Sequence, residues 1–469
     1  MITQAGAGRC DRPAIRPSWS HSRNLRGRPR VAARTPSAIA DRVVREKSLY
    51  TTGPKPDAKA DPRDSAPSRL QRLRLLGPAF VAAIAYVDPG NVATNVTAGA
   101  TYGYLLVWVI VAANLMACLV QYLSAKLGLV TGQSLPEALR DRMPRVGRLA
   151  YWAQAELVAV ATDLAEVLGG AIALHLLFDL PLPVGGLVTG LVSMGLLALQ
   201  SRRGQQPFEQ VIIALLAVIT VGFCAGLFVA PPSAPGAANG LIPRFDGTDS
   251  VLLAAGMLGA TVMPHAIYLH SALARDRHGG QEGQQRRKLL SATKYDVGMA
   301  MLVAGAVNLA MLLLAATALR GNETDGSLEG AHAAVGAHLG GGIALLFAVG
   351  LLASGFASTA VGCYAGAVIM GGLLRRRISL VIRRTITMIP ALVMLAAGAD
   401  PTHALVISQV VLSFGIPFAL IPLVVLTSRR SVMGCYANRT PVVVAATLVV
   451  VVIITLNLVL IYLTMAAAT

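Results

Sequence analysis

Residues 77–96 read GPAFVAAIAYVDPGNVATNV, an apolar run that is interrupted at its centre by Asp88-Pro89-Gly90-Asn91. Pro89 has no backbone N–H and Gly90 has a low helix propensity, so we expect the helix to unwind near residue 88. In hydrocarbon each freed backbone group needs a partner, and an ionised Asp at mid-membrane costs about 2.5–3.5 kcal/mol on insertion scales. The stretch therefore predicts a binding site within a membrane helix. The alternative is a kinked structural helix in which Asp88 pairs with a Lys or Arg.

The composition indicates a multi-pass membrane protein. Of the 469 residues, 55% are hydrophobic and 13% are charged, which excludes an ordinary soluble domain. Apolar runs of about 17–25 residues, the length that spans a bilayer, recur along most of the chain. We expect an all-α protein with eleven membrane helices, at residues 75–96, 104–126, 149–174, 182–199, 209–229, 250–274, 295–319, 340–373, 384–398, 404–427 and 441–464.

The distribution of Lys and Arg sets the predicted orientation, because cytoplasmic loops carry an excess of these residues. With a cytoplasmic N-terminus, 38 of the 40 Lys and Arg lie on the cytoplasmic side, and Arg244 and Arg320 alone lie outside. We therefore expect a cytoplasmic N-terminus, an outside C-terminus and a location in the cell membrane, plasma or inner. The same distribution accounts for the net charge of +17, so nucleic-acid binding is not expected.

Residues 1–70 differ from the rest of the chain. They are rich in Arg, Pro, Ser and Ala and contain no apolar core, which predicts a disordered basic cytoplasmic tail. Six acidic residues among the first 74 argue against an organelle transit peptide.

A second interrupted run predicts internal repeats. Residues 250–273 read SVLLAAGMLGATVMPHAIYLHSAL, and Met263-Pro264-His265 break this run as Asp88-Pro89 breaks the first. Paired interruptions at the start of two sets of five helices predict two repeats with the substrate between them. Because each set has an odd number of helices, the second set crosses the membrane in the opposite orientation to the first. We expect a first five-helix repeat, a second one and an additional eleventh helix, at residues 71–230, 231–428 and 429–469.

The polar residues of the broken helices and of the tenth run suggest a metal site. Asp88, Asn91, Met263 and Gln409 would supply one carboxylate oxygen, two amide oxygens and a thioether sulfur. Unwound carbonyls near Ala85 and Ala260 would add to them. Oxygen ligands alone suit Mg²⁺ or Ca²⁺, whereas a soft sulfur shifts the preference towards Mn²⁺, Fe²⁺, Co²⁺ and Cd²⁺. The alternative for Met263 is an ordinary gap filler of an apolar helix.

The third run carries three acidic residues. Glu156, Asp163 and Glu166 are spaced by seven and three residues, which places them on one face of a helix. Ordered acids on a membrane helix suit a proton or cation relay. The alternative is structural pairing with cytoplasmic arginines, and Arg383 and Arg384 are candidate partners under either interpretation.

Two histidines follow the second interruption. His265 and His270 lie on the cytoplasmic half of that helix, where a neutral imidazole would carry or gate a proton. A satisfied structural histidine is the alternative for each. The sequence contains no HExxH, Walker, GxSxG or CxxC pattern, so we do not expect an enzyme.

Asp88-Pro89-Gly90-Asn91 followed by Met263-Pro264-His265 resembles the Nramp family of proton-coupled divalent metal transporters. The resemblance extends from about residue 70 to 465 and includes ANLMACLVQYLSAKLG and SQVVLSFGIPFALIPL. It implies a LeuT-type fold with discontinuous first and sixth helices, and import of Mn²⁺ or Fe²⁺ with protons by alternating access. The implied metal ligands are Asp88, Asn91, Met263, Ala260, Ala85 and Gln409. The implied proton pathway or its salt-bridge network includes His265, Glu156, Asp163, Glu166, Arg383 and Arg384, and we add His270.

The expected partners are a divalent metal ion, protons and the lipid bilayer, with no resident cofactor and a monomeric chain. Two other functions were considered. One is a LeuT-type, cation-coupled carrier of a small organic solute, although Asp88 would repel an anionic substrate. The other is an intramembrane metal-dependent hydrolase, for which a clustered His and Glu ligand set is missing from the sequence.

Overall fold

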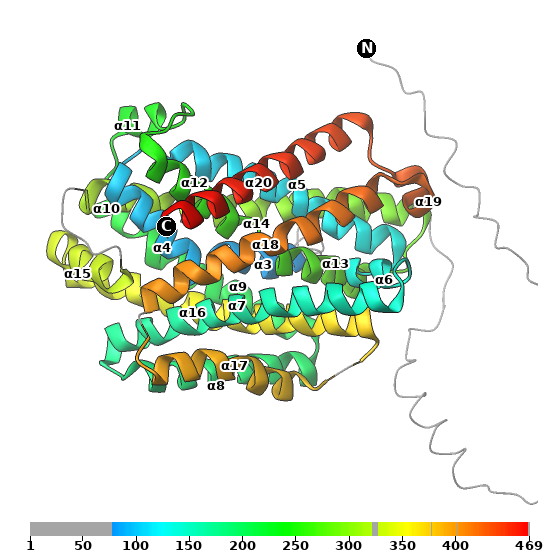
Figure 1. Ribbon diagram of the computed structural model, residues 1–469, viewed down its shortest axis with the longest axis horizontal. Coiled ribbons are helices and arrows are strands. Elements are labelled where there is room, and N and C mark those ends of the chain that lie inside the picture. Colours follow the sequence, from blue (N-terminus) through cyan, green and yellow to red (C-terminus); the bar gives the residue numbers. More distant parts are fainter. Residues whose placement is uncertain (1–76, 321–326, 377, 400, 468–469) are drawn as a thin grey trace, which may run out of the picture. The chain divides into compact units, whose positions relative to one another are not determined.

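A computed structural model describes residues 77–320, 327–376, 378–399 and 401–467. The tail predicted for residues 1–70 lies outside the described residues. In the described part the chain is entirely helical, and no strand is present. Long helices lie side by side along one direction (Figure 1).

Each of the eleven predicted runs corresponds to a helix or to a pair of half-helices. The first comprises α3 (Pro78–Ala83), the 3-10 turn η1 (Ile84–Tyr86) and α4 (Pro89–Tyr102). The sixth comprises α12 (Gly247–Thr261) and α13 (Pro264–His278). The others are α5 (Val107–Thr131), α7 (Arg145–Phe178), α8 (Leu182–Arg203), α9 (Gln205–Cys224) continued by α10 (Gly226–Val229), α14 (Gly283–Ala318), α16 (Gly341–Leu374), α17 (Leu380–Ala396), α18 (Pro401–Ser428) and α20 (Thr440–Ala467).

Nine helices among the described residues have the length and hydropathy needed to cross a membrane. The other two predicted runs fall short for identifiable reasons. The first is interrupted, and its longer half, α4, has 14 residues. The ninth, α17, has 17 residues and contains Arg383 and Arg384. The break in the first run and the two arginines in α17 therefore lie at residues that the sequence analysis assigns to the candidate site or its salt-bridge network.

Several helix ends differ from their predicted positions. Helix α14 begins at Gly283 rather than at residue 295, because the polar segment before the apolar run continues the helix. Helix α5 continues past the predicted end at residue 126 to Thr131, and the Lys126 ammonium group donates to Asn438. Four short helices were not predicted, namely α6 (Leu135–Arg140), α11 (Ala234–Asn239), α15 (Leu328–Leu339) and α19 (Arg430–Met433), the last followed by the turn η2 (Gly434–Tyr436).

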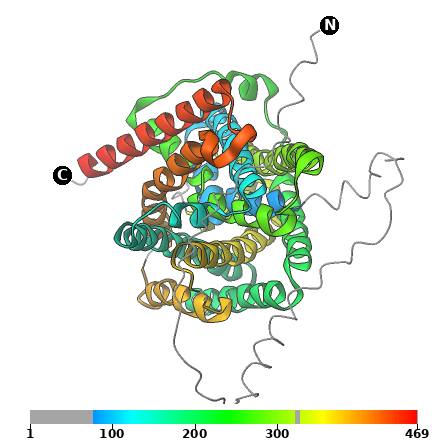
Figure 2. The ribbon, with the colours of Figure 1, turned by 90° about the vertical axis from the view of Figure 1, so that its right-hand side faces the viewer.

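The two sets of five helices run in opposite directions. In Figure 1, α3 leads leftwards into α4, whereas α12 leads rightwards into α13. The broken helices lie in the interior: α4 packs on α14 and α12, and α13 packs on α5 and α16. Helix α20 packs on α18 and α12 and lies at the edge of the bundle when it is viewed from the end that carries α6 and α19 (Figure 2).

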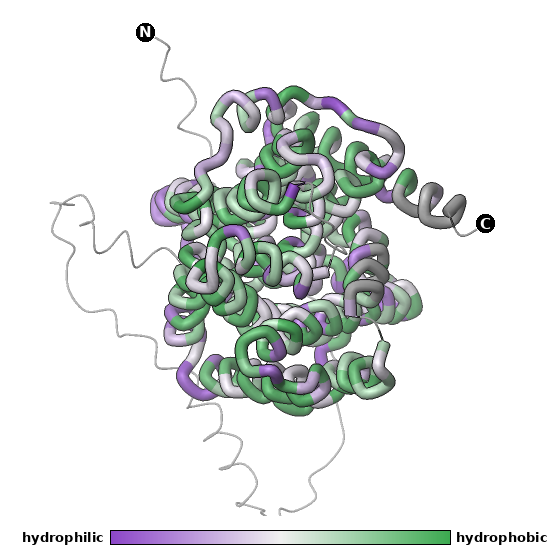
Figure 3. The backbone as a smooth tube through the Cα atoms, turned by 90° about the vertical axis from the view of Figure 1, so that its left-hand side faces the viewer, coloured by the Kyte–Doolittle hydropathy of each residue, from purple (hydrophilic) through white to green (hydrophobic). Residues whose placement is uncertain are grey.

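The outward faces of the helices are apolar. Hydrophobic residues follow most of the helical tube, and hydrophilic ones gather mainly in the connecting segments (Figure 3). Leu157 on α7, Leu187 on α8 and Val444 on α20 are exposed, which suits contact with lipid. The interior instead contains buried polar side chains, and these define the candidate site.

Candidate metal-binding site

The break in the first membrane helix is a helix cap. Val87 and Asp88 lie outside both helical halves, with φ −130° and ψ 31° for Val87 and φ −71° and ψ 166° for Asp88. Pro89 is the first residue of α4, where its missing N–H would have no partner within the helix. The Asp88 carboxylate accepts the backbone N–H of Asn91 at 2.9 Å. The local sequence thus ends one helix and starts the next inside the bundle.

The break in the sixth membrane helix has the same form. Val262 and Met263 are non-helical, with φ −94° and ψ 78° and with φ −74° and ψ 120° respectively. Pro264 is the first residue of α13. Met263 occupies the position that corresponds to Asp88, and its side chain does not cap the helix. One repeat therefore offers an anionic oxygen at this position and the other a thioether.

Asn91 joins the two breaks. Its side-chain nitrogen donates to Asp88 Oδ1 at 2.6 Å and to the carbonyl of Ala260 at 3.0 Å. Asp88 and Asn91 are 1% exposed and Ala260 is fully buried. Three of the predicted ligands therefore form one buried cluster. The amide nitrogen contacts two oxygens that a cation would bind, and rotation of the amide would replace this N–H donor by its own oxygen.

Gln409 of α18 lies against the same break. Gly90 provides the space, because a Cβ atom at Gly90 would overlap the side-chain nitrogen of Gln409. Asp88 Oδ2 and Gln409 Oε1 are both buried, and neither has a hydrogen-bond partner among the described residues. Buried polar atoms normally find a partner. These two oxygens therefore fit a cation as their partner.

Met263 and Ala85 are fully buried at the two breaks and belong to one hydrophobic cluster. No Lys or Arg among the described residues forms an ion pair with Asp88, which contradicts the alternative of a paired structural carboxylate. In the same part of the chain, no group of three His, Cys, Asp or Glu residues is placed to hold a metal ion. The cluster accordingly contains a single carboxylate, as predicted.

The acidic face of α7 meets α17. Arg384, which is fully buried, pairs with Asp163, and Arg383 pairs with Glu156 at 2.5 Å. Glu156 retains 20% of its side-chain exposure, whereas Asp163 retains 2%. The predicted partners are thus brought together, in a geometry compatible with both the relay and the structural interpretation.

Glu166 continues this series towards the breaks. It is fully buried, and its carboxylate has no hydrogen-bond donor among the described residues. Gly362 of α16 leaves room for it, since a Cβ atom there would lie against the carboxylate. Glu166 lies near enough to Asp163 and to Asp88 to interact electrostatically with each of them. The acids therefore form a line from the first break to the arginines of α17.

The two histidines have different surroundings. His265 is 2% exposed, and neither ring nitrogen has a partner among the described residues. It lines a cavity of about 10 Å³, which is room for roughly one water molecule. His270 instead contacts Gln121 Oε1 through Nδ1 at 2.7 Å, and Gln121 donates to the Tyr86 hydroxyl at 2.5 Å. His270 thus faces α5, away from the acids of α7.

Two further residues contact the first break. Asn308 of α14 donates to the Tyr86 carbonyl at 2.7 Å, and Ser354 of α16 donates to the Val87 carbonyl at 2.6 Å. Asn308 could have been identified from the sequence, because it is an isolated side-chain amide within an apolar run. Ser354 is one of several small residues of α16, and the sequence contains nothing that would single it out.

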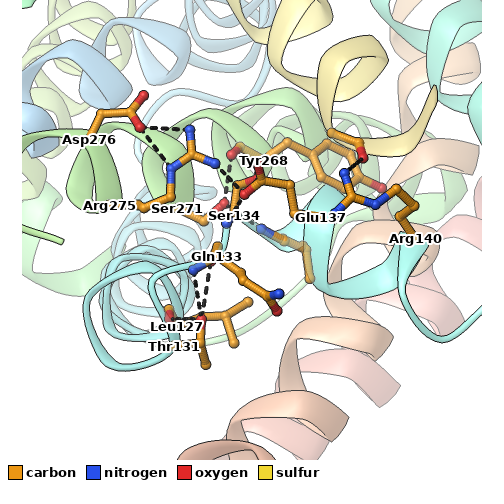
Figure 4. Close-up of polar contacts among 12 residues, drawn as sticks. Leu127, Thr131, Gln133, Ser134, Glu137, Arg140, Tyr268, Ser271, Arg275 and Asp276 are labelled. Atoms are coloured by element: carbon orange, nitrogen blue, oxygen red, sulfur yellow. Dashed lines mark hydrogen bonds and ion pairs between the residues drawn. The ribbon is translucent and has the colours of Figure 1, made fainter. Parts of the chain in front are cut away.

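Polar contacts join α6 to α13 at the end of the bundle that is predicted to be cytoplasmic. Figure 4 shows Arg275 of α13 between Asp276 and Glu137, and Glu137 also accepts the backbone N–H of Ser134 at 2.8 Å. Partial burial by itself raises the pKa of Glu137, but the Ser134 hydrogen bonds and the Arg275 guanidinium hold it below its usual value. Short helix α6 is thereby fixed to α13.

The start of α3 is fixed at the same end. The Asp296 carboxylate of α14 accepts the backbone N–H groups of Gly77 and Ala79 at 3.1 and 3.2 Å. Asp296 is 4% exposed, so this contact is protected from water. Next to Gly77, Arg277 pairs with Glu209 of α9. Carboxylates thus hold the inner half of the first broken helix against its neighbours.

Two half-helix pairs of opposite direction, with buried polar atoms gathered at their breaks, define a membrane protein of the LeuT type. The family model described as natural resistance-associated macrophage protein-like, Nramp, matches residues 79–463. The chain belongs to the Nramp family.

Relatives match most of the chain. The divalent metal cation transporter MntH of Mycobacterium tuberculosis is 63% identical over 403 residues, which cover 86% of this chain and 94% of the relative. MntH of Bacillus subtilis is 48% identical over 391 residues, 83% of this chain and 92% of the relative. In both cases the match covers more than nine tenths of the relative's own length.

Solved structures share the fold. The Eremococcus coleocola manganese transporter, crystallised with an aromatic bis-isothiourea substituted compound, matches with a TM-score of 0.77 at 32% identity, covering 83% of this chain and 86% of that one. Mhp1, a nucleobase-cation-symport-1 family transporter, matches with a TM-score of 0.55 at 16% identity, covering 82% and 89%. The second likeness concerns the fold alone.

Proposed function

We propose that this protein imports the divalent transition metal ions Mn²⁺ and Fe²⁺ together with protons, by alternating access. The observation that carries the proposal is the Asn91 amide, which bridges Asp88 and the Ala260 carbonyl beside the unpartnered oxygens of Asp88 and Gln409. The names of the relatives, divalent metal cation transporter and manganese transporter, support the same class of cargo.

The metal ligands that we propose are Asp88, Asn91, Met263, Gln409 and the carbonyls of Ala260 and Ala85. A single carboxylate among neutral ligands binds a dication moderately, so that the ion can be released. The thioether of Met263 adds a preference for softer ions over Ca²⁺ and Mg²⁺. These properties suit a transport site rather than a structural metal site.

Proton coupling would use the line of acids on α7. A dication beside Asp88 favours the ionised carboxylate, so a proton held there would be released as the metal binds. Glu166 is the next acid in line, followed by Asp163 and Glu156 with their arginine partners. His265 is a second acceptor next to a water-sized cavity. Charge repulsion alone then couples the two ions.

The remaining proposals concern the location, the orientation and the working unit of the protein. We place the chain in the cell membrane with a cytoplasmic N-terminus, because of the distribution of Lys and Arg. We assign it no enzymatic activity and no resident cofactor, and we take the monomer as the working unit. For an organic solute as cargo, no observation comparable to the Asn91 bridge is found.

The test is uptake of Mn²⁺ into proteoliposomes with an imposed pH gradient, measured with a metal-sensitive dye inside and with a pH indicator. Asp88→Ala is expected to abolish Mn²⁺ uptake and the accompanying proton flux. Asp179→Asn is the control, since this carboxylate is 97% exposed at the end of α7. Full Mn²⁺ uptake by Asp88→Ala would remove the site assignment, and wild-type uptake of amino acids in place of metal would favour an organic solute.

A further inference from the structure

The backbone carbonyl groups of the unwound stretch before Asp88 differ in whether they accept a hydrogen bond. The Ile84 carbonyl accepts the backbone N–H of Val87 at 3.1 Å. The Tyr86 carbonyl accepts from Asn308 at 2.7 Å, and the Val87 carbonyl accepts from Ser354 at 2.6 Å. Among the described residues, no donor contacts the carbonyl of Ala85.

Both donors are buried and come from the second repeat. Ser354 is fully buried and Asn308 is 4% exposed. Asn308 is itself oriented by Asn95, whose side chain donates to Asn308 Oδ1 at 2.8 Å. This bond leaves the Asn308 nitrogen facing the Tyr86 carbonyl. The orientation of the donor is therefore fixed from both sides.

A carbonyl that accepts a strong hydrogen bond is held in place, whereas one without a donor is available to an ion. Val87 lies between the two half-helices in a non-helical conformation, and among the described residues no backbone N–H donates to its carbonyl. Val87 is also the residue next to Asp88. Without Ser354, its carbonyl would be a buried acceptor in need of a partner beside the metal site.

We propose that Ser354 and Asn308 are positioning residues that set the ion selectivity of the site, by withholding the Val87 and Tyr86 carbonyls from the metal. The inference rests on the proposed function. Ca²⁺ takes about six to eight oxygen ligands, whereas the softer transition metal ions accept fewer ligands and a sulfur among them. Each additional carbonyl would therefore improve the site mainly for Ca²⁺. The two donors keep the number of oxygen ligands low.

The decisive variant is Ser354→Ala, compared with Ser354→Thr, which retains a hydroxyl. Mn²⁺ uptake into proteoliposomes is measured at increasing Ca²⁺. For Ser354→Ala, the Ca²⁺ concentration that halves Mn²⁺ uptake is expected to fall roughly tenfold, equivalent to about 1.4 kcal/mol. Ser354→Thr is expected to match the wild type.

A matched control is Ser358→Ala on the same helix. Ser358 is also fully buried, but its hydroxyl bonds to Gly355 within α16 at 3.5 Å and does not reach the unwound stretch. Loss of a buried hydroxyl alone should therefore leave Ca²⁺ inhibition unchanged. Asn308→Leu is the second test variant, and it should increase Ca²⁺ inhibition because it frees the Tyr86 carbonyl.

Binding of Ca²⁺ alone and of Mn²⁺ alone to purified protein, by isothermal titration calorimetry, provides a readout that does not require transport. If Ser354→Ala does not fold, Asn308→Leu decides the question. Folded variants with wild-type Ca²⁺ binding and wild-type Ca²⁺ inhibition would overturn the positioning role. Failure of the wild type to take up Mn²⁺ would instead overturn the proposed function, so the two failures are distinguishable.

Discussion

The side-chain amide of Asn91 donates to the Ala260 carbonyl at 3.0 Å and so links the start of α4 to the end of α12. The same nitrogen donates to Asp88 Oδ1 at 2.6 Å. This N–H group bridges the Ala260 carbonyl and Asp88 Oδ1, and Asp88 Oδ1 also accepts the backbone N–H of Asn91 at 2.9 Å. Under the proposed function Asn91 would have two tasks, which are to donate to these oxygens when no metal is bound and to offer its own oxygen to the metal.

Asn91→Asp separates these tasks. The substitution removes the amide donor and places a second carboxylate beside Asp88, which repels it in the absence of metal. Without metal, the variant is therefore expected to be less stable than the wild type by about 1–3 kcal/mol. With Mn²⁺ present, the added negative charge should strengthen binding and increase the metal-induced rise in Tm. Thermal unfolding with and without Mn²⁺ measures both effects. A smaller metal-induced rise than in the wild type would contradict the placement of the ion next to Asn91.

Met263→Ala tests the contribution of sulfur. Cd²⁺ is softer than Mn²⁺, so loss of the thioether should weaken Cd²⁺ more than Mn²⁺ and relax discrimination against Ca²⁺ and Mg²⁺. Competition of each ion against Mn²⁺ uptake in proteoliposomes provides the comparison. Met257→Ala controls for the loss of volume, because Met257 is also a buried methionine and lies in α12. An unchanged order of ions would show that Met263 only fills space.

The parts of the site that break a general rule were predictable from sequence. Asp88-Pro89 and Met263-Pro264 interrupt apolar helices, and Arg383 and Arg384 put charge into a membrane run, so each requires a reason. The pairing of Arg384 with Asp163 could be predicted as a candidate because few charged residues of opposite sign lie within the apolar runs. Fold class followed from the same interruptions and from their spacing.

The contacts that position the breaks were not predictable. Ser354 is an ordinary small residue in a helix with many Gly, Ala and Ser residues, and its contact with Val87 depends on the packing of α16. The Asp296 contact with Gly77 joins residues 219 positions apart in sequence. His270 is predicted to belong to the proton pathway from its position on the cytoplasmic half of the broken helix, and its contact with Gln121 of α5 could not be predicted from that position. Tertiary packing, which local patterns do not encode, decides such contacts.

The buried pair of Asp163 and Arg384 should be far more sensitive to loss of one partner than to loss of both. Arg384→Gln leaves an uncompensated buried carboxylate, which costs about 3–5 kcal/mol of unfolding free energy. The double variant Asp163→Leu with Arg384→Met removes both charges and should recover most of that loss. Unfolding in detergent by denaturant measures both. Arg383→Gln is the control with a smaller expected loss, because the carboxylate that it leaves without a partner, Glu156, is 20% exposed. Equal losses in the single and double variants would contradict the argument.

Asp296→Asn should loosen the inner half of the first broken helix. The carboxylate accepts two backbone N–H groups of the α3 start, and a neutral amide cannot replace both charge-assisted bonds. If α3 moves when the cytoplasmic side opens, the open state becomes more populated. We expect faster Mn²⁺ release to the inside and greater access to buried positions of α3.

Access is measured as the rate of maleimide labelling at Ala82→Cys, which is fully buried in α3, after the five native cysteines have been replaced by serine or alanine. Labelling should be several-fold faster in the Asp296→Asn background. Asp276→Asn is the matched control, because Asp276 lies at the same end of the bundle and, among the described residues, pairs with Arg275 rather than with α3. Equal labelling rates in the two backgrounds would show that Asp296 does not hold α3.

Glu137→Gln should lower stability by an amount that does not depend on pH between about 5.5 and 7.5. The pKa of Glu137 is held below its usual value of 4.5, so its carboxylate is ionised in the folded protein throughout this range. A lowered pKa contributes stability that is present above the usual value and is lost as pH falls through the folded-state value. The variant loses the bond to the Ser134 N–H and the pair with Arg275, about 1–2 kcal/mol. Thermal unfolding of both proteins across this range gives the difference. A difference that shrinks as pH falls from about 7.5 to 5.5 would mean that Glu137 titrates near neutrality, and α6 would then belong to the proton-sensitive part of the transporter.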